Sequence, residues 1–133
     1  MEWRQNGQPE ILLYQIPVQE MMRLLPILQR HGCRAVQVTA GQYGIPLGQL
    51  AQGSVQQEAK QAGAGSPLPE SMMVFCGCGD PLLDCLLADM RQSGVRISSK
   101  AVLTPHNKTW TTVELYQALR QERAAISAQK RQK

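Results

Sequence analysis

Residues 72–104 read MMVFCGCGDPLLDCLLADMRQSGVRISSKAVLT, and this stretch decides the fold class. It begins with the apolar run 72–76, whose length suits a buried strand. Leucines and a methionine then recur at helical spacing after Asp80, a good N-cap, and Pro81, which suits the first helical position. Gly94 ends that helix, and residues 100–104 form the next strand candidate. The stretch therefore predicts a strand–helix–strand unit.

The first half of the chain carries the same plan. Residues 11–16 and 35–39 are strand candidates, and they are separated by a helical pattern that ends at Gly32. The apolar face predicted for this helix contains Val18, Met21, Met22, Leu25 and Leu28. Pro26 lies inside the pattern, and an interior proline predicts a kink or a shortened helix. A short helix is expected after Pro46, ending near Ala51.

The predicted fold class is α/β, with two similar βαβα halves forming one four-stranded, mostly parallel sheet with helices packed on it. The two halves agree in spacing, because a leucine of the following helix comes 11 positions after Thr39 in one and after Thr104 in the other. A two-layer α+β, ferredoxin-like arrangement is the alternative. The predicted parts of this single domain are a first half over 10–51, a flexible linker over 52–70, a second half over 71–126 and a basic tail over 127–133.

The loops that follow the strands are the expected place for a ligand. If all four strands are parallel, these loops share one edge of the sheet, where ligands bind in open α/β folds. The edge would collect Pro17 and the loops 39–45, 76–79 and 104–110.

The net charge of +4 lies at the end of the chain. From Arg120 onward there are five basic residues and one acidic residue, whereas the remaining 119 residues hold nine of each. A neutral body argues against a nucleic-acid-binding face. The sequence also contains neither a signal peptide pattern nor an apolar run long enough for a membrane span, so a cytoplasmic protein is expected.

Two of the four cysteines, Cys76 and Cys78, lie at a predicted strand end just before a helix. A thiol near helix amides can have a lowered pKa, as a redox nucleophile or metal ligand requires. The spacing matches none of the usual zinc motifs, and cytosolic thiols are normally reduced. Packing of small residues at a tight turn is the simpler interpretation.

The run KAVLTPHNKTWT at 100–111 is the most distinctive in the chain. Thr111 and Glu114 have the spacing of a capping box, with Trp110 placed as a hydrophobic staple. Asn107 suits a turn and is expected to add one modest hydrogen bond. His106 and Lys108 are interpreted as solvated loop residues.

The pattern Lys-Ala-Val-Leu-Thr-x-x-Asn-x-x-Trp-Thr at 100–111, with the later Glu122, resembles the end of a bacterial family called domain of unknown function 3783. The resemblance covers roughly residues 70–123 and implies no reaction or cofactor. It does imply where a site would be sought, at Lys100, Thr104, Asn107 and Trp110.

Two functions are expected from these observations. The first is a non-enzymatic module of bacterial cytoplasm that binds a small anionic ligand or another protein, as a homodimer or accessory unit. Its mark would be a cleft where Asn107, Thr104 and helix amides converge. The alternative is a thiol-redox or metal-sensing protein using Cys76 and Cys78. No catalytic motif or pair of carboxylates is present, so the sequence leaves enzymatic activity open but argues against it, and it implies no cofactor.

Overall fold

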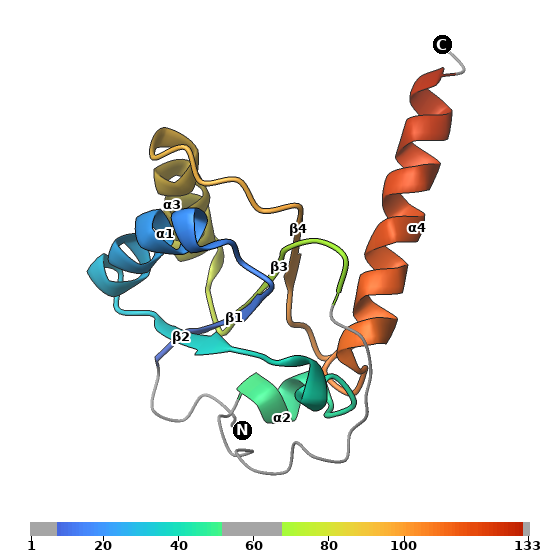
Figure 1. Cartoon of the computed structure of the whole chain (residues 1–133), viewed down its shortest axis with the longest axis horizontal. Coiled ribbons are helices and arrows are strands. Elements are labelled where there is room, and N and C mark those ends of the chain that lie inside the picture. The colour runs from blue at the N-terminus through green and yellow to red at the C-terminus, as the bar shows by residue number, and fades with distance from the viewer. Residues whose placement is uncertain (1–7, 52–67, 132–133) are drawn as a thin grey trace.

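The computed structural model describes residues 8–51 and 68–131, with side chains as far as residue 125 (Figure 1). The elements in chain order are β1 (Glu10–Tyr14), α1 (Val18–Arg30), β2 (Arg34–Gln37), the 3-10 turn η1 (Ala40–Gln42), α2 (Leu47–Ala51), β3 (Met72–Cys76), α3 (Asp80–Gln92), β4 (Ser99–Val102) and α4 (Thr112–Arg131). All four predicted strands are present, and their ends lie within two residues of the predicted ones. Most of the predicted linker, residues 52–67, lies outside the described residues.

The four strands form one mixed sheet in the order β2-β1-β3-β4. The two outer pairings are parallel, but β1 and β3 are antiparallel, with Glu10 opposite Cys76 and Tyr14 opposite Met72. The expectation that all strand-end loops share one edge is therefore wrong. Loops leave β1 and β2 at one edge and β3 and β4 at the other. Strands joined by a single helix are parallel within each half, as that connection favours. The connection between α2 and β3 is of a different kind, so it does not determine the direction of β3 relative to β1.

Helices cover both faces of the sheet (Figure 1). One face packs against α1 and α3 in the α1–α3 cluster, which includes Ile11, Leu13, Leu24, Ile27, Leu28, Met73, Phe75, Leu86 and Met90. The other packs against α2 and the start of α4 in the α2–α4 cluster, which includes Leu12, Tyr14, Leu47, Leu50, Met72, Val74, Cys76, Leu115 and Tyr116. The alternation of side chains along β1 and β3 divides the core in this way. Three layers rule out the two-layer alternative.

The face that helix α1 presents to the sheet agrees only in part with the predicted one, because Leu28 is buried and Met21 packs against the α1–α3 cluster, but Val18 and Met22 do not. Its buried residues are Leu24, Ile27 and Leu28, whereas Val18 and Met22 are 74% and 70% exposed. Two neighbouring apolar ridges run along this helix, and contact with the sheet selects one of them. The helix also continues through Pro26 to Arg30, so the shortened helix is wrong. Pro26 lies on the exposed side, where water can reach the carbonyl that loses its partner.

The predicted helix ends in the two strand–helix–strand units are confirmed. Gly32 and Gly94 have φ of 73° and 75°, a left-handed conformation that glycine adopts without strain. The N-terminus of α3 differs by one residue, because Gly79 is the N-cap and Asp80 is already helical. As an acidic residue in the first turn, Asp80 still complements the helix dipole.

Helix α4 continues to Arg131, into the predicted basic tail, and its distal part extends beyond the sheet (Figure 1). Residues 120–125 are all exposed. None of the helices in the described part of the chain combines the length and apolar character needed to cross a bilayer.

Glu70 attaches the middle of α4 to the sheet. Its Oε2 atom accepts hydrogen bonds from Tyr116 (3.0 Å), Ser99 (3.2 Å) and Arg123. The bond from Arg123 holds the pKa of Glu70 below its usual range; partial burial opposes this shift, and the bonds from Tyr116 and Ser99 add to it. The ionised carboxylate is thus the form that the fold stabilises.

We expect Glu70→Gln to destabilise the fold at neutral pH and to lose this effect in acid. The stabilisation by Glu70 is complete above its unfolded pKa, near 4.5, and is lost as the pH falls through the lower folded-state pKa. Urea denaturation of both proteins at about pH 7 and at about pH 3 provides the test. The difference in free energy of unfolding between wild type and variant should be smaller at the lower pH. Glu122→Gln, an exposed α4 position, is the control; a pH dependence equal to that of the control would contradict the role of Glu70.

Candidate functional site

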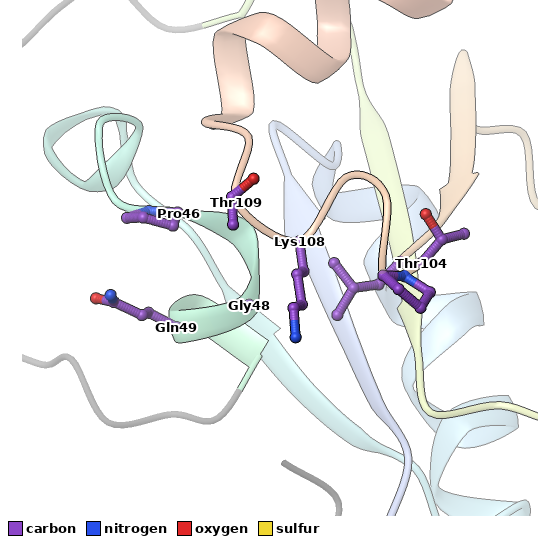
Figure 2. Close-up of a pocket in the computed structure, with 8 residues that line it drawn as sticks. Pro46, Gly48, Gln49, Thr104, Lys108 and Thr109 are labelled. Atoms are coloured by element: carbon purple, nitrogen blue, oxygen red, sulfur yellow. The ribbon is translucent and has the colours of Figure 1, made fainter. Parts of the chain in front are cut away.

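A cavity of about 320 Å³ lies between α2 and the loop that follows β4 (Figure 2). We call it the α2–loop cavity. Its lining residues are Pro46, Gly48 and Gln49 from the first half and Leu103, Thr104, Pro105, Lys108 and Thr109 from the second. The volume is at the lower end of the range of small-molecule sites.

Backbone hydrogen bonds hold the two walls of this cavity together. The amide of Leu47 donates to the Trp110 carbonyl at 2.9 Å, and the amide of Gly48 donates to the Lys108 carbonyl at 2.8 Å. A Cβ atom on Gly48 would lie 3.2 Å from that carbonyl oxygen and 3.3 Å from the Lys108 Cβ. Glycine is therefore what allows α2 to approach the loop so closely.

Asn107 organises the loop and does not line the cavity. Its Oδ1 accepts from the Thr104 amide at 2.9 Å, its Nδ2 donates to the Val102 carbonyl at 3.1 Å, and its own amide donates to Thr104 Oγ1 at 3.2 Å. The residue is only 9% exposed. The expectation of one modest hydrogen bond is wrong, because the side chain closes the turn in two directions.

Trp110 and Thr111 join the loop to α4. Trp110 is half-buried, packs against the α2–α4 cluster and has the His106 ring 5.3 Å away. Thr111 and Glu114 form the predicted capping box: the Thr111 amide donates to Glu114 Oε1 at 2.9 Å, and the Glu114 amide donates to Thr111 Oγ1 at 3.3 Å. Trp110 does not line the α2–loop cavity. Its packing against the core is the structural reason for a tryptophan at this position of the pattern 100–111.

Lys100 lies at the opposite end of β4 from the loop. Its Nζ donates to the Ile97 carbonyl at 3.2 Å, and it lines a separate cavity with residues of α4. Of the four residues that the resemblance suggested, the structure places only Thr104 in the lining of the α2–loop cavity, with Asn107 supporting the loop behind it.

Lys108 is the site residue that the sequence analysis missed. Figure 2 shows its side chain reaching into the gap between α2 and the loop, beside Gly48. Among the side chains that the structure describes, in residues 8–51 and 68–125, its ammonium group has no hydrogen-bond or ion-pair partner and no acidic residue lines the cavity. One sequence signal could have identified it: Lys108 is the only lysine or arginine between residues 101 and 119.

The chemistry of the cavity is otherwise neutral. Thr104, Thr109 and Gln49 are its uncharged polar lining residues, and Figure 2 shows both threonine hydroxyls pointing away from the Lys108 ammonium group. Pro46, Leu103 and Pro105 form the apolar part of the wall. A single cation against an apolar wall can hold an anion and contact its uncharged part. Helix amides do not converge there as expected, because those of Leu47 and Gly48 already donate to the loop.

Burial disfavours the thiolate forms of Cys76 and Cys78. Cys76 is buried in the α2–α4 cluster, and Cys78 packs against the α1–α3 cluster. Burial raises the pKa of Cys76 far above its usual range, and burial together with Cys33 raises the pKa of Cys78 to about 11. Because redox attack and metal binding need the thiolate, both shifts oppose that chemistry. No group of three His, Cys, Asp or Glu side chains in the described residues is arranged to hold a metal ion.

Residues 71–126 match the family described as Domain of unknown function (DUF3783), which confirms the resemblance over the second half. No curated protein and no solved structure matches the chain. The matched segment contains the 103–109 wall of the α2–loop cavity, whereas α2 lies outside it.

Proposed function

We propose that this chain is a non-catalytic binding module that holds a small anionic ligand in the α2–loop cavity. The observation that carries the proposal is the Lys108 ammonium group, which faces a cavity without an acidic lining residue among the described residues. Its charge is therefore available to a ligand.

The surroundings of Lys108 make that charge more effective. Two unit charges 4 Å apart attract by about 1 kcal/mol in bulk water and about 4 kcal/mol in the partly screened surroundings of a protein surface. The apolar side chains of Pro46, Leu103 and Pro105 form part of the cavity wall, so the dielectric constant there is lower than in bulk water. A bound anion would gain from this lower dielectric and would not be repelled by a neighbouring carboxylate.

The lining supports binding better than catalysis. Among the described residues, the nucleophile candidates in the cavity are the hydroxyls of Thr104 and Thr109, and neither hydroxyl has a histidine or carboxylate partner in the lining. An activated hydroxyl needs such a base within hydrogen-bond distance. No observation favours the thiol-redox or metal-sensing alternative, because burial raises the pKa of both thiols.

We expect Lys108→Met to weaken binding of anions at this cavity by about 10- to 100-fold, the range for losing one charge-assisted hydrogen bond. Methionine keeps the length of the side chain and removes its charge. The measurement is NMR titration of labelled protein with phosphate, acetate and hexanoate. Because the Lys108 side chain is exposed, the free energy of unfolding of the Lys108→Met variant should be close to that of the wild type.

Lys100→Met is the matched control, because Lys100 is the other lysine of the sequence pattern and lies outside the cavity. It should leave anion binding unchanged. An equal loss in both variants would mean that general surface charge attracts the anions and would refute the site.

The proposal extends to the cellular location, the assembly and the evolutionary origin of the module. We place the module in bacterial cytoplasm, as a homodimer or as the accessory unit of another protein. We also propose that the two halves descend from one βαβα unit, since their elements follow the same order and their parallel strand pairs meet at β1 and β3.

A further inference from the structure

We infer that the ligand of the α2–loop cavity is a monocarboxylate with an apolar body. This inference rests on the proposed function and deepens it by naming a ligand class. It is drawn from three features of the lining, which are its single cation, its mostly occupied backbone donors and its apolar wall.

The single cation fits a single negative charge. Sites for phosphate groups usually combine arginine forks, backbone amides or a helix N-terminus, because the group carries more charge and more acceptor oxygens. No arginine lines the cavity among the described residues. Lysine acts as a point charge, which one carboxylate neutralises.

Most of the backbone donors in the lining are already used, and the amide of Thr109 is the exception. The amides of Leu47 and Gly48 donate to loop carbonyls at 2.9 and 2.8 Å. The amide of Thr104 donates to Asn107 Oδ1 at 2.9 Å. A phosphate group would therefore find few of the backbone N–H groups that such sites supply. Figure 2 shows the hydroxyls of Thr104 and Thr109 pointing away from the Lys108 ammonium group, so Lys108 is the donor that meets the charge of a ligand, and one carboxylate matches it.

The apolar part of the cavity wall favours a ligand with an apolar body. Pro46 and Pro105 are rigid rings, and Leu103 is 7% exposed within the α2–α4 cluster, so these surfaces do not rearrange to present polar groups. A ligand consisting only of a charged group would leave them in contact with water. Chain or ring carbons beside the carboxylate would cover them and gain from the transfer.

A series of simple acids tests the inference. Acetate, butyrate and hexanoate are titrated into labelled wild-type protein, together with neutral hexanamide and inorganic phosphate, and the chemical shifts around residues 46–49 and 103–109 are followed. Each added methylene should strengthen binding by up to about fourfold, the effect of burying one methylene group. Hexanamide should bind at least about tenfold more weakly than hexanoate, and in Lys108→Met this difference should disappear.

The outcomes separate the ligand class from the proposed function. Phosphate that binds more tightly than hexanoate through Lys108 would overturn the carboxylate class and leave the anion site intact. Acetate and hexanoate of equal affinity would overturn the apolar body alone. Hexanamide that binds as well as hexanoate, or no saturable binding of any anion at the cavity, would overturn the proposed function and this inference together.

Discussion

Phe75→Ala is expected to lower the free energy of unfolding by about 3–5 kcal/mol, the usual cost of removing a buried phenyl ring. Phe75 is 1% exposed on the central strand β3 and belongs to the α1–α3 cluster. Its loss would leave an empty volume between the sheet and both helices of that face. Strands β1 and β4 flank it on either side, with Ile11 and Val102 directly opposite, so neighbouring backbone cannot collapse into the space.

Urea or thermal denaturation of the variant measures this loss. Phe75→Leu is the matched variant, because it keeps apolar volume and should cost no more than about half as much. Val102→Ala, at a 39% exposed position of the edge strand, should cost much less than either. Similar stabilities for Phe75→Ala and Val102→Ala would contradict the placement of Phe75 in the core.

The second large effect concerns Asn107, whose replacement by alanine should destabilise the fold by about 2–3 kcal/mol. Two side-chain hydrogen bonds are lost, each contributing about 0.5–1.5 kcal/mol, and the groups left without a partner add a desolvation cost. Because the loop carries Lys108, ligand binding should weaken as well, in step with the loss of loop structure.

Two variants distinguish this structural role from a direct ligand contact. Asn107→Asp keeps the acceptor for the Thr104 amide but loses the donor to the Val102 carbonyl, so its stability should fall between those of wild type and alanine variant. Lys108→Met should retain stability and lose binding. If Asn107→Ala melts like wild type but does not bind anions, Asn107 is a ligand contact and the account of the loop given above is wrong.

Local signals in the sequence were sufficient for much of the fold. The apolar run at 72–76 predicts β3 to the residue, Gly32 and Gly94 mark two helix ends, and the Thr111–Glu114 capping box is present as expected. Each of these features depends on residues within one turn or one strand. At these positions the local conformational preference of the residues agrees with the folded structure, because no contact with a distant part of the chain opposes it.

Features that depend on distant contacts were not predictable in the same way. The predicted buried face of α1 was only partly right because two apolar ridges compete, and only contact with β1 and β3 selects Leu24, Ile27 and Leu28. The α2–loop cavity has walls more than 50 residues apart in sequence, joined by the Gly48–Lys108 hydrogen bond. Lys108 therefore resembles an ordinary loop residue until the antiparallel centre of the sheet is known.

That antiparallel centre also determines how the chain reaches its native state. The two parallel pairings join strands separated by a single helix, so each can form early by closing a short loop. The β1–β3 pairing joins residues as far apart as Glu10 and Cys76, and it completes the sheet. Such long-range closure is the slow step in folding, because its entropy cost precedes most of its contacts. The same pairing covers the inner edges of β1 and β3, which would otherwise be open to pairing with another chain.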